Sequence, residues 1–248
     1  MSKKSNYSYV GIAFIILVFG ILFIPKIVDR IKNDDISRSD RISNVPDNNF
    51  STQEKLMFIE VNGAPKKVPD FSFVNQDGDT ITNADYLGKV YIVEFFFTTC
   101  PTICPIMSHN LVQIQERFKG IENFGVASFT INPSYDTPEV LKAYAEKYGV
   151  TNPNWNLMTG KREDIYQLAN LGFNLYAAEN ETVAGGFEHS GNFALIDKNG
   201  FIRSRSDNYG NPQIYYRGTI TESEKYNEDG EEEEISMLKE DIKKLLNE

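Results

Sequence analysis

The sequence predicts one α/β domain with a mixed central sheet flanked by helices, preceded by a single N-terminal apolar segment. Segments with strand character alternate along the chain with segments of helical periodicity, as in an α/β sandwich. Residues 90–97 form a β-branched and aromatic run, which is typical of a strand buried on both faces. Residues 10–24 contain only apolar side chains and glycine. We therefore expect one well-cored domain behind a membrane-spanning segment.

The composition narrows the functional classes. The net charge of −10 argues against nucleic acid as a partner, because phosphate binding needs a basic surface. The hydrophobic fraction of 41% is ordinary for a globular protein. Two cysteines are too few for a disulfide-stapled scaffold, so the domain must be held together by its core.

The chain divides into four predicted parts. Residues 1–8 are a short N-terminal tail, and residues 9–28 are a transmembrane anchor, because their apolar run approaches the ~20 residues that a spanning helix needs. A cleaved signal peptide is the alternative, but no small-residue cleavage pattern follows the run. Residues 29–54 are rich in Asp, Asn, Ser and Arg and predict a flexible tether. Residues 55–248 are the folded domain.

The first elements of the folded part are predicted as strands. Residues 56–61 have the pattern of an edge strand. Residues 68–73 alternate and lead through the turn Gln76–Asp79 into residues 80–82, which predicts a β-hairpin with an Asp-Gly turn. The run at 90–97 follows as the central strand.

Helices and strands then alternate toward the C-terminus. Apolar side chains recur at helical spacing from Pro105 to Phe118 and predict a helix there. A second helix is predicted at 137–148, because Thr137 suits its N-cap and Pro138 its first position. The other expected elements are a strand at 124–131, a helix near 163–171, strands at 192–197 and 201–204, and a helix at 235–246.

The only two cysteines, Cys100 and Cys104, follow the predicted central strand. Chemistry in α/β folds gathers at the carboxyl ends of the strands. Pro105 suits the first turn of a helix, which places Cys104 at or beside the N-cap, where a thiolate is stabilised and its pKa lowered. Such a pair can close a disulfide, hold a soft metal, or do both in turn.

The chain has two histidines with different prospects. His109 lies on the helix after the cysteines and is predicted to be a surface residue. His189 lies in a glycine-flanked stretch, Gly185 to Gly191, which is predicted to be a loop before the strand at 192–197. Two thiolates and one imidazole form a three-coordinate soft site that suits Cu(I), whereas zinc would want a fourth ligand.

Three short motifs together resemble the SCO/SenC family: Cys100–Pro105, Asp136–Glu139 and the stretch from His189 to Asp197. Members of this family are membrane-anchored, thioredoxin-fold copper proteins that help to assemble the dinuclear copper site of cytochrome c oxidase. The resemblance implies a thioredoxin-like fold from about Val68 to the last helix. It also implies that Cys100, Cys104 and His189 bind copper, as Cu(I) and also as Cu(II), and that the two cysteines form a reversible disulfide.

The resemblance also implies partners and a location. The partners are the copper-receiving subunit of the oxidase, an upstream copper donor and the membrane. We expect a single-pass protein of the bacterial inner membrane with its domain on the extracytoplasmic, periplasmic side. No Arg- and Ser-rich transit segment precedes the span, which disfavours a mitochondrial home. The Lys and Arg residues that follow the span would by themselves place the domain in the cytoplasm, so sidedness rests on the resemblance.

We compare three alternative functions with the residues named above. The first is a copper metallochaperone, which is not an enzyme. The second is a thiol-disulfide oxidoreductase that reduces the copper-ligand cysteines of the oxidase subunit through Cys100 and Cys104. The third, a thiol peroxidase, would need one activated cysteine beside an arginine and a threonine, and matches the pair poorly. An ordinary thioredoxin would need a cis-proline facing the cysteines, and no proline lies between Pro153 and Pro212.

Overall fold

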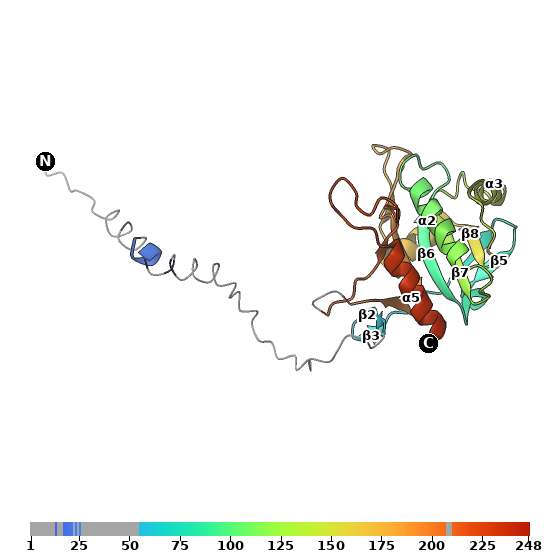
Figure 1. The fold of residues 1–248 in the computed structure, drawn as a ribbon. Helices are drawn as coiled ribbons and strands as arrows, with labels where there is room; N and C mark the ends of the chain where they lie inside the picture. The colour runs from blue at the N-terminus through green and yellow to red at the C-terminus, as the bar shows by residue number, and fades with distance from the viewer. Residues whose placement is uncertain (1–12, 14–16, 22, 24, 26–54, 207–209) are drawn as a thin grey trace. The chain divides into compact units, whose positions relative to one another are not determined.

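The computed structural model describes residues 13, 17–21, 23, 25, 55–206 and 210–248 (Figure 1). The tail predicted at 1–8 and the tether predicted at 29–54 lie outside the described residues. Most of the anchor predicted at 9–28 lies outside them too. Within the described part of the chain, every helix is too short or too polar to cross a bilayer.

A mixed sheet of nine strands forms the centre of the described domain. The strand order is β1-β12-β11-β6-β7-β8-β4-β5, and β13 pairs with β11. The pairs β6–β7 and β7–β8 are parallel, and the other pairs are antiparallel. The strand bounds are β1 Met57–Phe58, β4 Ser72–Asn75, β5 Thr80–Thr82, β6 Val90–Phe96, β7 Phe124–Thr130, β8 Trp155–Thr159, β11 Asn192–Ile196, β12 Ile202–Ser204 and β13 Tyr216–Arg217.

The two central strands confirm the prediction of a doubly buried core. Every residue of β6 and of β7 is buried, in a parallel register that runs from Val90 opposite Phe124 to Phe96 opposite Thr130. Helices cover both faces of the sheet, so these strands need apolar side chains on both sides. The hairpin with the Asp-Gly turn is confirmed, although its first strand, β4, begins at Ser72 instead of residue 68. The edge strand predicted at 56–61 is confirmed only at β1, because residues 60–61 belong to a separate strand, β2.

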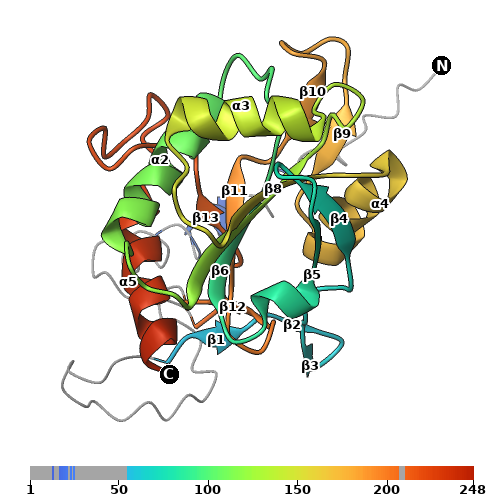
Figure 2. The ribbon, with the colours of Figure 1, turned by 90° about the vertical axis from the view of Figure 1, so that its right-hand side faces the viewer.

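Helices lie on both sides of the sheet (Figures 1 and 2). Figure 2 shows α2 and α5 together on one side and α4 on the other. Thr137 caps α3 as predicted, because its hydroxyl accepts a hydrogen bond from the Val140 N–H at 3.4 Å. The helices are α2 Cys104–Arg117, α3 Pro138–Tyr148, α4 Arg162–Gln167, the π-helical turn η2 Leu168–Phe173, the short 3-10 helix η1 Asn83–Tyr86 and α5 Ile235–Asn247.

Strand β13 and three further features of the fold were not predicted from the sequence. Strand β8 has polar residues beside its apolar ones, so its short pattern gave no strand signal. One of them, Asn156, is buried and hydrogen-bonded to Asn75 and Tyr86. The second feature is a separate hairpin formed by β9, Ala177–Glu179, and β10, Phe187–His189. A further small hairpin joins β2, Glu60–Val61, to β3, Ala64–Pro65.

Candidate metal centre

The structure brings the three predicted ligands together. One ligand atom each from Cys100, Cys104 and His189 lies within 4.8 Å of the other two. The Cys104 Sγ is 3.2 Å from the His189 Nε2, and the Cys104 N–H donates to the Cys100 Sγ at 3.5 Å. Both cysteines are free thiols. We call these three residues the metal cluster.

The two sulfur atoms are positioned by the junction of β6 and α2. Cys100 lies four residues past the end of β6, and its N–H donates to the Phe97 carbonyl at 3.3 Å. Cys104 is the first residue of α2, next to the N-cap residue Ile103, as the sequence predicted. Both cysteines are buried, so their protonation depends strongly on their few neighbours.

The charge within the pair corrects one expectation. The helix start was expected to stabilise a thiolate at Cys104, but the N–H at this position points to the Cys100 sulfur. A hydrogen bond from the Cys104 side chain lowers the pKa of Cys100 to about 3, against burial and with help from His189. Burial raises the pKa of Cys104, and the adjacent Cys100 raises it further. Both the helix N–H on its sulfur and these opposite pKa shifts favour the negative charge on Cys100 over Cys104.

His189 reaches the cluster on the hairpin β9–β10, with Ala177 opposite it in the register. This corrects the predicted loop. The left-handed φ of +89° at Gly185 and its close contacts explain the glycine there. A Cβ at this position would lie 2.9 Å from the Phe97 ring and 3.1 Å from Pro101. The hairpin can thus pack directly against the segment that carries Cys100.

The other predicted histidine stays outside the cluster. His109 is exposed on α2, as expected, and is not among the residues that could hold a metal. The ring of His189 also packs edge-to-face on Phe97, with centroids 5.9 Å apart. Its Nδ1 is buried and has no hydrogen-bond partner among the described residues, while its Nε2 faces the sulfur. The Nε2 is therefore the nitrogen available to a metal.

Sequence reasoning missed a buried acid beneath the cluster. Glu94 lies in β6, six residues before Cys100, and is 2% exposed. Burial raises the pKa of Glu94 to about 7, against a 2.6 Å hydrogen bond from the Ser128 hydroxyl. The other carboxyl oxygen has no partner among the described residues. The sequence carried one signal for this residue, because Glu94 is the charged residue in the otherwise apolar run at 90–97.

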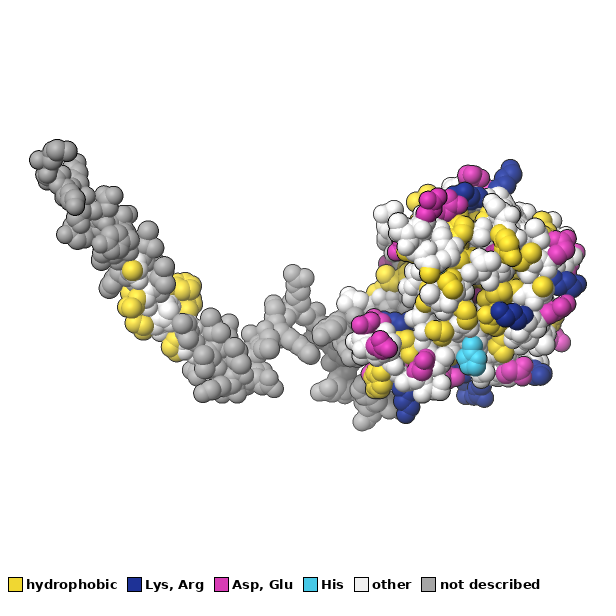
Figure 3. All heavy atoms as spheres, turned by 90° about the horizontal axis from the view of Figure 1, so that it is seen from above, with side chains coloured by type: hydrophobic (Ala, Val, Ile, Leu, Met, Phe, Trp, Pro, Cys, Tyr) yellow, Lys and Arg dark blue, Asp and Glu magenta, His cyan; other side chains and the backbone are white. Residues whose placement is uncertain are grey.

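The end of the sheet that carries the metal cluster is the upper face in Figures 1 and 2 and faces the viewer in Figure 3. Figure 3 shows many hydrophobic side chains exposed there among uncharged surface. Exposed aromatic residues on segments next to the cluster include Tyr135 and Tyr176, at 54% and 53% exposure. This end therefore offers contact area beside the ligands.

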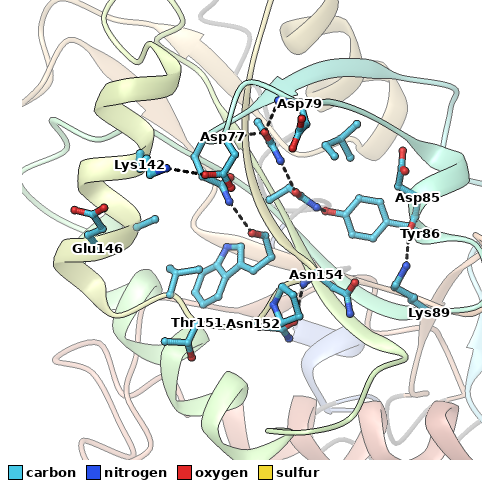
Figure 4. Close-up of a pocket in the computed structure, with 18 residues that line it drawn as sticks. Asp77, Asp79, Asp85, Tyr86, Lys89, Lys142, Glu146, Thr151, Asn152 and Asn154 are labelled. Carbon is cyan, nitrogen blue, oxygen red and sulfur yellow. Dashed lines mark hydrogen bonds and ion pairs between the residues drawn. The ribbon is translucent and has the colours of Figure 1, made fainter.

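A hollow of about 480 Å³ lies at the opposite end of the parallel strands. It is bordered by Lys89, just before β6, and by Trp155, the first residue of β8. Figure 4 shows Lys142 of α3 reaching Asp77 across it, in an ion pair of 3.0 Å. We call it the amino-end hollow. The metal cluster is not part of its lining.

Comparison with known proteins gives the family. A family model described as SCO1/SenC matches residues 60–221. The SCO1 protein homolog of Bacillus subtilis is 38% identical over 96 residues, which cover 38% of this chain and 49% of that relative. The matched segment thus spans about half of that relative's length.

Two solved structures share the fold. A SCO1/SenC family lipoprotein from Bacillus anthracis is 30% identical with a TM-score of 0.60, covering 73% of this chain and 95% of that one. Bradyrhizobium japonicum ScoI, solved with copper bound, is 19% identical with a TM-score of 0.52, covering 73% of this chain and 99% of that one. The fold is the mixed α/β, thioredoxin-like fold of Sco proteins, and the chain belongs to the SCO1/SenC family.

Proposed function

We propose that this protein is a metallochaperone that carries copper to the dinuclear copper site of cytochrome c oxidase. The observation that carries the proposal is the metal cluster, in which three soft donor atoms from separate elements converge within 4.8 Å. The structure of ScoI with copper bound supports it by showing that this fold accommodates the metal. The receiving partner follows from membership in the SCO1/SenC family.

The donor set determines which ion fits. Two sulfurs and one imidazole nitrogen prefer Cu(I) among biological metals, and three ligands satisfy it. Zinc in a structural site takes four protein ligands. The group found in the described residues has three members, Cys100, Cys104 and His189. We propose all three as copper ligands, with Cu(II) as a second state of the cargo.

The residues suggest an order of binding. The Cys100 sulfur is the first to attract the cation, because hydrogen bonds from Cys104 and His189 lower the pKa of this thiol. Cys104 must release its proton as the ion displaces it, and the His189 Nε2 then completes the site. Because Cu(I) replaces one proton, the net charge of the buried site is unchanged. Neither loading nor release of the ion therefore adds a large desolvation cost.

We also propose the remaining organisation of the chain. Residues 9–28 anchor it in the bacterial inner membrane, and residues 29–54 tether the domain 55–248 on the extracytoplasmic side. The apolar run at 10–24 supports the anchor. The partners would then be an upstream copper donor and the copper-receiving oxidase subunit. A topology reporter fused after Glu248 tests the sidedness, and a signal from the cytoplasm would contradict it.

The protonation of the pair also favours a second function, thiol-disulfide exchange that reduces the ligand cysteines of the oxidase. A low-pKa thiolate at Cys100 beside a protonated resolving thiol at Cys104 is the arrangement such exchange needs. The Cys100 thiolate would attack a partner disulfide, forming a mixed disulfide and freeing one partner thiol. Cys104 would then attack the Cys100 sulfur, forming the Cys100–Cys104 disulfide and releasing the second partner thiol. The electrons would pass from the two thiols to the partner disulfide.

Anaerobic titration of Cu(I) into the reduced full-length protein in detergent tests the proposal. We expect one copper per chain, with X-ray absorption showing sulfur and nitrogen ligands. Failure to retain stoichiometric copper would refute the carrier function. Reduction of an oxidised oxidase-subunit peptide by a protein that holds no copper would favour the exchange function instead.

A further inference from the structure

We propose that the buried carboxylate of Asp136 is a positioning residue for the copper centre. In this role it fixes Thr98 and, through Thr98, the short segment that carries Cys100. The inference rests on the proposed function for its copper readout, but it makes a separate claim about the cysteine pair itself. Asp136 lies in the loop between β7 and α3 and touches none of the three ligands in the described hydrogen bonds.

Asp136 is 0% exposed, and both of its carboxylate oxygens accept hydrogen bonds. The Thr98 N–H donates to Oδ2 at 3.1 Å, and the Thr98 hydroxyl donates to Oδ1. The Thr130 hydroxyl also donates to Oδ2. All three donors are neutral, and no ion pair to Asp136 occurs within the described residues.

A buried carboxylate without a cation is an expensive way to join two segments. Removing a charge from water costs several kcal/mol, and neutral donors recover only part of it. Neutral side chains of similar shape could join the same segments at a lower cost. We therefore infer that the strong, two-oxygen acceptor is needed for the precision of the contact and not for stability alone.

Asp136 itself is held firmly by its own neighbours. The Asp136 N–H donates to the Asn132 carbonyl at 3.0 Å, and the next residue, Thr137, caps α3. Thr130, the last residue of β7, contributes its hydroxyl to Asp136 and also accepts from the Asn132 N–H at 3.0 Å. The carboxylate is thus fixed to both a central strand and a helix.

The segment that carries Cys100 is tied to the loop of Asp136 through one residue. Within the described residues, Thr98 is the member of 97–99 whose side chain makes a hydrogen bond, and both its hydroxyl and its backbone N–H donate to Asp136. Cys104, by contrast, is fixed by α2, and His189 by its hairpin. Cys100 follows Thr98 by two residues, and its N–H also donates to the Phe97 carbonyl at 3.3 Å, so the Thr98 contact is one of the restraints on where its sulfur lies. Metal sites tolerate displacements of only about 0.5 Å.

Three variants of the full-length protein test this inference. Asp136→Asn keeps the size of the side chain and removes its charge. Thr98→Val removes one hydroxyl donor and leaves the backbone N–H. Asp241→Asn is the matched control, because Asp241 on α5 is equally buried, at 0% exposure, but pairs with Arg205, which directly follows β12, and with Tyr216 of β13.

Three quantities are measured for each variant. Competition with a Cu(I) chelator gives the copper affinity, equilibration with a glutathione buffer gives the equilibrium constant of the Cys100–Cys104 disulfide, and denaturant unfolding gives the stability. We expect Asp136→Asn to lower the copper affinity about 10- to 100-fold and to lower the disulfide equilibrium constant as well. Thr98→Val should change both in the same direction but less. Asp241→Asn should lower stability and leave both constants unchanged.

The outcomes separate the two proposals. Wild-type constants in a folded Asp136→Asn protein would overturn the inference. If that variant does not fold, Thr98→Val decides alone, and wild-type constants there would overturn it equally. If the unaltered protein binds no copper, the proposed function fails, while the disulfide equilibrium still tests the role of Asp136.

Discussion

The two ends of the parallel strands differ in how completely their buried polar groups are paired. At the amino-end hollow the groups form a closed chain, in which Asn75 donates to Asn156 at 2.9 Å and Asn156 donates to the Tyr86 hydroxyl at 3.0 Å. Tyr86 in turn donates to the Val126 carbonyl at 2.9 Å. At the other end, buried atoms of His189 and Glu94 lack partners within the described residues.

This difference separates stability from function. Paired polar groups hold elements together and leave nothing for a ligand. Unpaired groups cost stability and remain available to bind. The contrast therefore predicts that changes at the metal cluster affect copper binding, whereas changes at the amino-end hollow affect the free energy of unfolding.

Oxidation should have the largest effect at the metal cluster. A disulfide between Cys100 and Cys104 engages both sulfurs, so two of the three donors are lost at once. We expect the oxidised protein to bind no stoichiometric copper and the reduced protein to bind one ion. Metal analysis after gel filtration measures both, and copper retained by the fully oxidised chain would break the comparison.

Replacement of His189 should have the second-largest effect on copper binding. We expect His189→Ala to weaken Cu(I) binding about 100-fold, because the remaining two-sulfur site lacks its nitrogen donor. His109→Ala is the control, because this side chain is exposed on α2. Chelator competition measures both affinities, and an equal loss in the two variants, or none in either, would exclude His189 as a ligand.

The buried acid should make stability depend on pH. The pKa of Glu94 is raised to about 7 by burial, so the folded protein holds a proton that the unfolded chain releases above its ordinary value of 4.5. The free energy of unfolding is therefore highest below the ordinary pKa of 4.5, and it falls by about 3 kcal/mol as the pH rises through about 7. We expect Glu94→Gln to remove this fall.

Trp155, the single tryptophan, provides the measurement. Its indole N–H donates to the Ser128 hydroxyl at 2.9 Å, and that hydroxyl donates to Glu94. Unfolding followed by its fluorescence at several pH values gives the slope. Glu116→Gln on the exposed face of α2 is the control and should keep the wild-type slope. A wild-type slope in Glu94→Gln would contradict the assignment.

The smallest effect is expected for a change at the amino-end hollow. Asn156→Ala should reduce the free energy of unfolding by about 1–3 kcal/mol, because the buried Asn75 amide and Tyr86 hydroxyl each lose one hydrogen bond. Copper affinity should stay at the wild-type value. Denaturant unfolding and chelator competition check the two halves of this prediction, and a weakened copper site would show that the two ends are not independent.

Much of this arrangement could be predicted from the sequence, for physical reasons that differ between elements. The long apolar run of β6 and the cap at Thr137 are local signals, so both were predicted correctly. Strand β8 and the hairpin that carries His189 are short, and their polar or glycine residues are explained only by partners distant in the chain.

The charge on the cysteine pair could not be predicted for a similar reason. The sequence places Cys104 at the start of a helix, but only the fold shows that its N–H points to the sulfur of Cys100. The role proposed for Asp136 likewise depends on Thr98, which lies 38 residues away in the chain. Spacing alone does not reveal such contacts.

The self-contained pairing of β9 with β10 has a consequence for redesign. These strands pair with each other and not with the central sheet, so the imidazole is delivered by a unit that is separate from the one that holds the sulfurs. The identity of the third donor can thus be exchanged without altering the strand pairing of β6. A harder oxygen donor at position 189 would shift the preference away from soft monovalent ions. The hairpin thus contributes the donor atom that determines which class of metal ion the site prefers.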